Sequence, residues 1–174
     1  IRYVLGYNLQ AYGTSSTLRL KSALNRGGTV EYIYMTNVVA DGVQNVLAAD
    51  LNWNPSYSYS ELPAEYEGKE VPEHWNVMLQ KVEPVEKGYP HFNHVYLANV
   101  KATNAKQFIS ASGWNDSLTL NDFTLYNLDV EAEKAGIVAH TKKFRLTDIK
   151  LKISDNSQIE FNKNSQLKKN IRYE

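Results

Sequence analysis

The residues best placed to do chemistry are two cations on a short predicted strand. From Leu18 to Lys21 apolar and basic residues alternate, so Leu18 and Leu20 should face an interior, with Arg19 and Lys21 side by side outside. Two cations this close repel each other unless an anion lies between or above them. Arg offers a planar fork that pairs with a carboxylate, and Lys adds a point charge. The pair predicts a carboxylate-binding surface; two solvated charges, or salt bridges to neighbouring strands, are the alternatives.

The strand that carries these cations follows a repeated octet. Positions 1, 3, 6 and 8 of the octet are apolar or small, and position 5 is Asn or Asp. The copies are residues 4–11, 33–40, 95–102, 123–130 and 144–151. In a straight strand, positions 3 and 6 point to opposite sides, so one apolar pair would face water. The pattern therefore predicts a bend at position 5, where Asn and Asp tolerate a left-handed backbone.

Stacked copies of this unit predict the fold. The residues at position 5 are Asn8, Asn37, Asn99, Asn127 and Asp148. On successive turns these asparagines would form an amide ladder. A second apolar alternation follows each octet and begins at Leu18, Val46, Phe108, Ile137 and Ile159. Three strands per turn indicate an all-β, right-handed parallel β-helix, with residues 1–174 as the C-terminal part of one domain. An antiparallel sandwich of similar strands is the alternative.

Residues 52–90 interrupt the repeat with a segment of different character. Its aromatic residues are Trp53, Tyr57, Tyr59, Tyr66, Trp75 and Tyr89, and its acidic cluster is Glu61, Glu65, Glu67, Glu70 and Glu73. An aromatic loop leaving one edge of a stack of turns is suited to form a binding wall, because Tyr and Trp present flat apolar faces to sugar rings. Alternatively, these aromatics only pin the loop to the strands.

Composition excludes several other classes. The 174 residues include 19 basic and 19 acidic side chains, so we expect no nucleic-acid partner. No apolar run approaches the roughly 20 residues that span a bilayer, so we expect no membrane partner. The chain has no cysteine, which excludes disulfides and thiolate chemistry. We find no window with a sustained helical period, in agreement with a β protein.

One motif resembles a known enzyme family. Leu18-Arg19-Leu20-Lys21-Ser22, followed by Asn25-Arg26-Gly27-Gly28, is similar to the Arg-Ile-Lys signature and the Arg-Gly-Gly loop of glycoside hydrolase family 28, the polygalacturonase-like pectin hydrolases. The order of strand, asparagine bend and motif matches over roughly residues 1–51. The resemblance implies that Arg19, Lys21 and Arg26 contact a pectic polysaccharide or oligosaccharide. That family usually has a Tyr near position 51, where this chain has Leu51, and Trp53 could stand in for it.

The resemblance also implies what this chain lacks. The family hydrolyses O-glycosidic bonds with inversion, using acids from an Asn-Thr-Asp motif and an Asp-Asp pair near a Gly-His-Gly motif. None of these motifs occurs in residues 1–174, so we assign no catalytic residue. We also expect no cofactor and no metal, because His91 and His94 would face opposite sides of a strand and no third ligand is placed.

These observations leave two main hypotheses. The chain is part of a pectin-directed hydrolase of the polygalacturonase or rhamnogalacturonan hydrolase type, which the resemblance places in the periplasm, at the cell surface or outside the cell. Alternatively, it is a non-catalytic polysaccharide-binding or structural β-helix; a pectin lyase with calcium ligands is a weaker third option. In either main case a stack opened at its first turn would expose Val4, Gly6 and Leu18, so we expect preceding N-terminal turns of the same protein to cover them.

Overall fold

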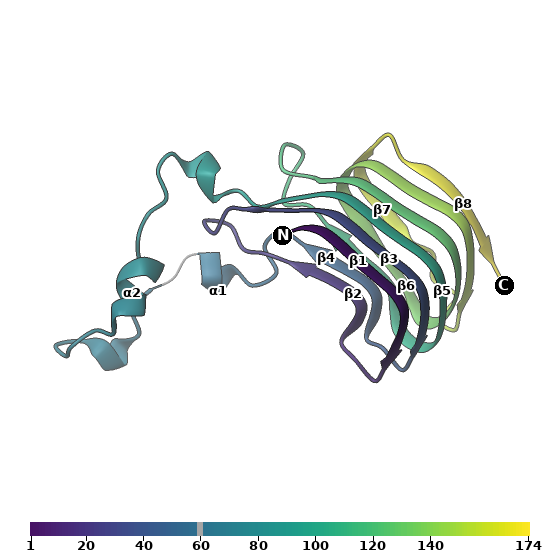
Figure 1. Ribbon diagram of the computed structural model, residues 1–174, viewed down its shortest axis with the longest axis horizontal. Coiled ribbons are helices and arrows are strands. Elements are labelled where there is room, and N and C mark those ends of the chain that lie inside the picture. The colour runs from purple at the N-terminus through teal and green to yellow at the C-terminus, as the bar shows by residue number, and fades with distance from the viewer. Residues whose placement is uncertain (59–60) are drawn as a thin grey trace.

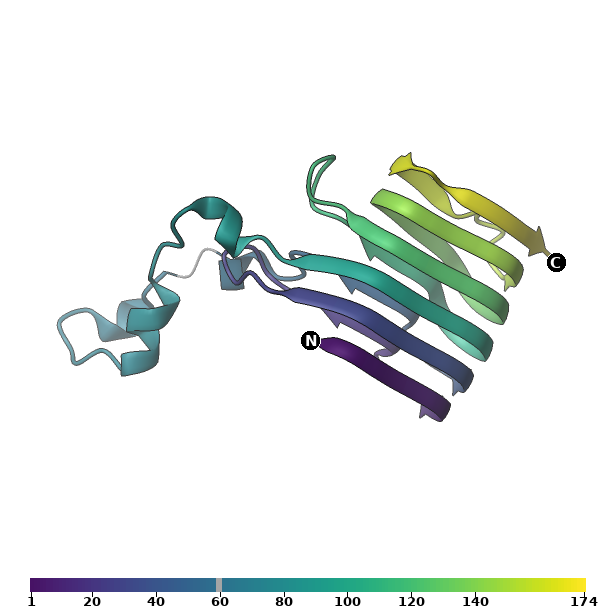
Figure 2. The same ribbon diagram turned by 45° about the horizontal axis from the view of Figure 1, so that its top comes forward.

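The chain is mostly β, and strands that are not consecutive in the sequence, such as β1 and β3, lie side by side (Figures 1 and 2). The computed structural model describes residues 1–58 and 61–174. The strands are β1 (Arg2–Tyr12), β2 (Ser16–Lys21), β3 (Thr29–Asp41), β4 (Asn45–Asp50), β5 (His91–Ser112), β6 (Leu120–Ile153), β7 (Glu160–Ser165) and β8 (Lys168–Tyr173). None of the helices in the described residues is long and apolar enough to cross a membrane.

All pairings between different strands of the described chain are parallel, which excludes the antiparallel sandwich. Strands β1, β3, β5 and β6 pair in succession, and so do β2, β4 and the second half of β5. The first four octets align position for position, because Val4 lies opposite Ile33, Ile33 opposite Val95, and Val95 opposite Phe123. The fifth octet follows, with the ring of Phe144 stacked on that of Phe123 at 5.5 Å.

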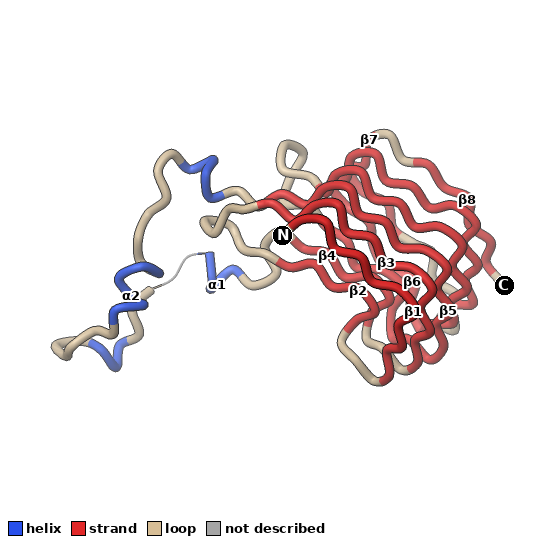
Figure 3. The backbone as a smooth tube through the Cα atoms, in the orientation of Figure 1, coloured by secondary structure: helices blue, strands red, loops and turns tan. Residues whose placement is uncertain are grey.

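The octets bend at position 5, as predicted. Asn8, Asn37, Asn99, Asn127 and Asp148 have φ angles of 54°, 56°, 52°, 54° and 54°. Such a left-handed residue turns the chain, so β5 and β6 run through several bends and stay paired, with one register shift between Ala102 and Ala105 (Figure 3). Positions on both sides of the bend then face one interior. Ile33, Val38, Val95 and Val100 are all buried there.

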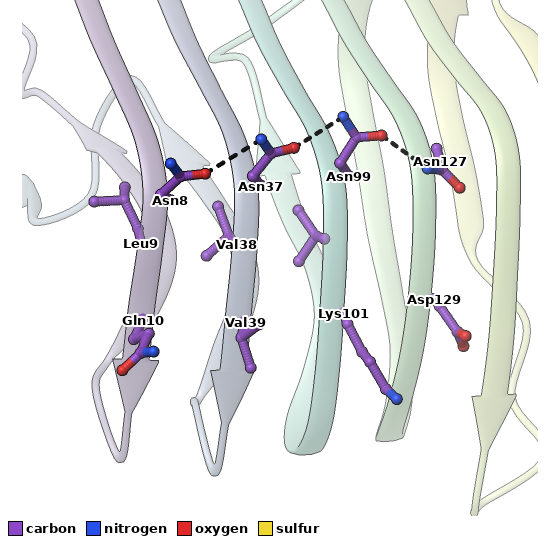
Figure 4. Close-up of a pocket in the computed structure, with 11 residues that line it drawn as sticks. Asn8, Leu9, Gln10, Asn37, Val38, Val39, Asn99, Lys101, Asn127 and Asp129 are labelled. Atoms are coloured by element: carbon purple, nitrogen blue, oxygen red, sulfur yellow. Dashed lines mark hydrogen bonds between the residues drawn. The ribbon is translucent and has the colours of Figure 1, made fainter.

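The predicted amide ladder connects the first four of these bends (Figure 4). The side-chain N–H of Asn37 donates to the carbonyl of Asn8 at 3.3 Å, that of Asn99 to Asn37 at 3.2 Å, and that of Asn127 to Asn99 at 2.8 Å. Each donor therefore points toward the N-terminal end of the stack. The ladder fixes the register of the strands it joins.

A second column of bends was not predicted. The residue that precedes each octet also has positive φ; these residues are Tyr3, Tyr32, His94, Asp122 and Lys143. The rings of Tyr3 and Tyr32 stack at 5.1 Å, and those of Tyr32 and His94 at 4.8 Å. Stacking and a hydrogen bond between side chains on neighbouring strands accompany the bends from Tyr3 to Asp122, although Tyr is not a typical bend residue.

The starting residues predicted for the second alternation align only in part. Val46 and Phe108 are in register, because Asn45 lies opposite Gln107 and Leu47 opposite Ile109. Leu18, however, lies opposite Leu47 rather than Val46, and Ile137 lies opposite Ser110 rather than Phe108. Val46 and Leu47 are both fully buried, and so are Phe108 and Ile109. Because consecutive residues are buried here, alternation does not show which of them faces the interior.

The N-terminal end of the stack is exposed at β1 but not at β2. Val4 is 42% exposed and Leu9 37%, whereas Ile33 and Val38, at the same register positions on β3, are 4% and 2% exposed. Gly6 is partly buried. The expectation that Leu18 is exposed was wrong, because it is buried at 6% against β4 and the core.

Residues 52–90 project from the strands as a loop with short helical turns (Figure 1). These turns are α1 (Pro55–Ser58), η1 (Ala64–Tyr66), α2 (Glu73–Met78) and η2 (Val85–Gly88). Each begins at a proline or directly after one. Proline fixes φ near the helical value and lacks an N–H that a first turn would leave unpaired, so it favours the start of such turns.

Candidate functional site

Strand β2 presents the two cations on its outer face, as predicted. Leu18 and Leu20 are buried, while Arg19 and Lys21 are exposed. Across the sheet, Arg19 lies opposite Ala48, which in turn lies opposite Ser110. The small side chains on β4 and β5 leave open space beside the guanidinium.

Backbone hydrogen bonds bring Trp53 to the end of β2. The N–H of Ser22 donates to the carbonyl of Asp50 at 3.1 Å, and the N–H of Trp53 donates to the carbonyl of Ser22 at 3.1 Å. The chain therefore turns directly after β4, so that Trp53 lies next to the residue that follows Lys21. The carboxylate of Asp50 accepts the N–H of Asn52 at 2.7 Å, which further fixes this turn.

Trp53 contacts both cations. The Lys21 ammonium lies 4.2 Å and the Arg19 guanidinium carbon 5.4 Å from the centroid of the Trp53 ring. An aromatic face attracts a cation by about 0.5–1 kcal/mol at an exposed site. The ion pairs of the described residues include neither Arg19 nor Lys21. The alternative of salt bridges to neighbouring strands is therefore not observed, and the indole offsets part of the repulsion between the two charges.

These three side chains line one groove with a volume of about 350 Å³. The groove runs across β2, β4 and β5, and the residues that line it are Ser15, Ser16, Arg19, Leu20, Lys21, Gln44, Asn45, Ala48, Ala49, Asp50, Trp53 and Ser110. Asp50 lies opposite Lys21 on β4 and was not predicted as a site residue. The signal was present, because Asp50 has the same offset from its octet as Lys21.

The structure does not place Arg26 among the residues that line this groove. Arg26 is exposed in the loop between β2 and β3, which the two ends of the 52–90 segment hold in place. The side-chain N–H of Asn25 donates to the carbonyl of Ser58 at 2.8 Å, and the N–H of Gly27 donates to that of Gly88 at 2.9 Å. The motif that contains Arg26 thus anchors the segment beside the groove.

The aromatic residues of the 52–90 segment have different surroundings. Tyr89 packs against the core, and the rings of Tyr66 and Trp75 contact each other with centroids 6.3 Å apart. Trp53 contacts the cations. Tyr59 and the side chain of Tyr57 lie outside the described residues. Tyr89 therefore pins the segment to the strands, while Trp53 lines a surface open to a ligand.

His94, near the start of β5, contacts side chains of two neighbouring strands. His94 stacks on Tyr32, and its Nδ1 lies 2.9 Å from the carboxylate of Asp122. In the described part of the chain no group of three or more His, Cys, Asp or Glu side chains is arranged to hold a metal.

A larger groove, of about 590 Å³, follows the amide ladder (Figure 4). Its asparagine amides are bonded to one another, and its Lys101 lies opposite Asp129 on the next strand. The smaller groove has a second cation, with Arg19 and Lys21 on one strand, and an indole beside its one carboxylate. We therefore place the candidate site in the smaller groove.

Comparison of the chain with family models, with curated proteins and with solved structures finds no match.

Proposed function

We propose that the groove across β2, β4 and β5 binds a sugar carboxylate of a pectic polysaccharide. The single observation that carries this proposal is the position of Arg19, Lys21 and Trp53 in one open groove. Arg19 supplies a fork for two carboxylate oxygens, and Lys21 adds charge beside it. Small neighbours such as Ala48 leave room for a ring above the strands.

The proposal includes a fold and a class of enzyme. The strands form consecutive turns of a right-handed parallel β-helix, an assignment supported by the parallel register of the octets and by the amide ladder. The motif around Arg19 and Lys21 resembles glycoside hydrolase family 28, so the chain is the C-terminal part of a pectin-directed hydrolase. Such an enzyme works where pectin is, in the periplasm, at the cell surface or outside the cell.

In this proposal Arg19 and Lys21 hold the sugar on the leaving-group side, and the catalytic acids come from preceding turns. Inverting glycosidases use two carboxyl groups about 6.5–9.5 Å apart, one as acid and one as base. Among the residues that line the groove, Asp50 is the one carboxylate. This same observation favours the second candidate function, a β-helix that binds polysaccharide without cutting it.

The exposed edge of β1 supports the presence of a preceding turn. The carbonyl of Asn8 accepts from Asn37, which leaves its N–H group directed away from β3. If a second copy of the chain paired with β1 through a two-fold axis, the Asn8 N–H groups of the two copies would face each other without an acceptor. A parallel strand with Asn or Asp at position 5 would instead supply an acceptor and cover Val4 and Leu9.

A tandem extension tests this edge. A copy of residues 1–29 placed before Ile1 adds one turn with the spacing that separates Asn8 from Asn37. We expect the extended chain to unfold at a higher temperature than the same extension in which the copy carries Asn8→Leu. Equal midpoints would show that the ladder does not select the preceding strand. If such a turn occurs in a longer chain, upstream Asn-Thr-Asp and Asp-Asp motifs favour the hydrolase, and neutral residues favour the binder.

Isothermal titration of the 174-residue chain with oligogalacturonate tests the binding function. We expect Lys21→Ala to weaken binding about tenfold, because it removes one of two cations from the carboxylate site. Lys101→Ala is the matched control, since Lys101 is exposed on a different groove. The affinity should also fall as salt is added. Equal effects of the two substitutions, or no binding at all, would contradict the proposal.

A further inference from the structure

The outer face of the strands between the two columns of bends is aromatic and carries no formal charge. On four neighbouring strands it is formed by residues 3–8, 32–37, 94–99 and 123–127, none of which is Asp, Glu, Lys or Arg. Its outward side chains lie in two rows across the sheet, Leu5–Tyr34–Tyr96–Thr124 and Tyr7–Thr36–Ala98–Tyr126. We call this surface the aromatic face. The candidate groove lies on other segments, across β2, β4 and the second half of β5.

The exposure of the aromatic face does not result from the open edge at β1. Tyr34 is paired on both sides, with β1 and with β5, and is still 44% exposed, and Tyr126 is 40% exposed. The inward position of Leu9, by contrast, is buried on the next strand, at Val38. A further turn before β1 would therefore cover inward positions such as Leu9 and leave the aromatic face open.

The rings of Tyr34 and Tyr96 do not cover each other. Their centroids are 6.3 Å apart and their planes are tilted by 47°. In the adjacent column of bends, the rings of Tyr3, Tyr32 and His94 are parallel to within 8° and do cover each other. A tilted ring leaves part of its flat apolar face toward solvent, where the C–H groups of a sugar ring can pack.

The second row combines large rings with small side chains. Thr36 and Ala98 lie between Tyr7 and Tyr126, so two aromatic side chains flank two small ones. Neighbouring strands are about 4.8 Å apart, close to the length of one sugar unit, so the two small residues leave room for about two sugar rings. The exposed amide of Asn37 borders this row and is a partner for sugar hydroxyls.

The size of the aromatic face favours an oligosaccharide segment over a second protein. Four residues along a strand span about 13 Å and four strands about 14 Å, which gives an area of roughly 200 Å². A stable protein interface needs about 800 Å² on each partner. The lack of charge favours an uncharged ligand, because a carboxylate held over these tyrosines would lose water without gaining a cation.

We infer that the aromatic face binds an extended, uncharged polysaccharide, with sugar rings packed against Tyr34 and Tyr126. This site is separate from the groove that contains Arg19 and Lys21, and it does not depend on uronate binding there. The protein therefore holds an uncharged chain on one face, whatever the groove binds on another.

Isothermal titration of the 174-residue chain with cellohexaose and with xylohexaose, two uncharged β-linked hexasaccharides, tests the inference. We expect Tyr34→Ala to weaken the binding of the tighter ligand at least fivefold, and Tyr34→Phe, which keeps the ring, to weaken it less than twofold. Tyr12→Ala is the matched control, because Tyr12 is 60% exposed at the end of β1 and lies outside the aromatic face. Added salt should leave the affinity unchanged, since no charge takes part.

The outcomes separate this inference from the proposed function. Lys21→Ala should leave the binding of the uncharged ligand unchanged, so the two sites can fail independently. If neither uncharged hexasaccharide binds, or if Tyr34→Ala and Tyr12→Ala have equal effects, the inference is overturned. Sedimentation equilibrium tests the other occupant, because a dimer that Tyr34→Ala dissociates would show that a second copy covers this face and would also overturn the inference.

Discussion

Asp122 lies between two cationic or ionisable side chains. Its carboxylate oxygens lie 2.6 Å from Nη1 of Arg145 and 2.9 Å from Nδ1 of His94. Partial burial, the largest single influence, raises the pKa of Asp122, but the hydrogen bonds and charges of Arg145 and His94 together outweigh it. The pKa of Asp122 therefore lies below its usual value, and its ionised form stabilises the fold.

This depressed pKa predicts a pH-dependent loss of stability. A carboxylate whose pKa is lower in the folded chain than in the unfolded chain stabilises the fold at pH values above its unfolded-state pKa, 3.8. This stabilisation is lost as the pH falls through the folded-state pKa. Asp122→Asn should lower the free energy of unfolding by about 1–2 kcal/mol at pH 7. The difference from the wild type should narrow below pH 3.8 in urea denaturation. A difference that stays constant down to pH 2 would contradict this account.

The sequence predicted which way single side chains on β2 point, but not what they touch. Alternation of Leu18, Arg19, Leu20 and Lys21 sufficed to place the cations outside, because strand parity is local. Their contact with Trp53 depends on the hydrogen bond between Trp53 and Ser22, which joins residues far apart in the chain. An anion was expected to offset the repulsion between the cations; in the structure an indole does so in part.

At the scale of the element, the octet bends because one residue in it tolerates a left-handed backbone. The ladder adds side-chain hydrogen bonds between neighbouring strands, and an asparagine inside the ladder has twice as many ladder neighbours as one at its end. Asn37 bonds to both Asn8 and Asn99, whereas Asn8 bonds to Asn37.

Comparing two substitutions measures how much the amide ladder contributes to the free energy of unfolding. Asn37→Ala and Asn8→Ala both place alanine at a φ near 55° and share that cost. Asn37→Ala should cost about 0.5–1 kcal/mol more, because it removes one additional amide bond. Chemical denaturation of the two variants gives the difference. Equal losses would show that the ladder contributes no stability beyond the bend itself.

The loop between β2 and β3 requires glycine at position 27. A Cβ at Gly27 would lie 2.3 Å from the carbonyl oxygen of Lys87, and its φ is 61°. Gly27 therefore allows the close approach of the end of the 52–90 segment, whose Gly88 carbonyl accepts the N–H of Gly27.

Gly27→Ala should lower the free energy of unfolding by about 3 kcal/mol. Gly13→Ala is a matched control, because Gly13 has a φ of 60° and nothing within 4 Å of its Cβ position. It should cost about 1 kcal/mol from backbone conformation alone. We also expect faster protease cleavage within the 52–90 segment in the Gly27 variant. If the two variants were equally stable, the close contact between position 27 and the Lys87 carbonyl would not be the reason that glycine is needed there.

For the whole molecule, the burial of the core depends on each strand having a paired strand on both sides. Leu9 and Val38 occupy the same register position, but Val38 lies between two strands and Leu9 on an exposed edge. Their exposed fractions, 37% and 2%, show how much burial a second neighbour provides.

Alanine substitutions should reveal this asymmetry. Val38→Ala should cost about 2 kcal/mol, from lost burial and the cavity left behind. Leu9→Ala removes more atoms, yet it should cost less in the 174-residue chain, because Leu9 is less buried. In a chain extended by one turn before β1, Leu9→Ala should become the more costly of the two. Thermal unfolding of both variants in both chains gives the comparison. If Leu9→Ala remained the less costly substitution in the extended chain, the added residues would not cover β1.

The sequence alone determined the octet, the bend at position 5 and the outward direction of Arg19 and Lys21, because each depends on strand parity or on one residue's backbone preference. It did not reveal the bend at Tyr32, since a tyrosine does not by itself indicate a left-handed backbone and its ring stacks on that of His94 from a strand far away in the sequence. The tertiary structure decided the register of the second alternation, because interstrand hydrogen bonds set it where neighbouring residues are both buried. It also decided that Trp53 and Asp50, from separate parts of the chain, meet Lys21 in one groove.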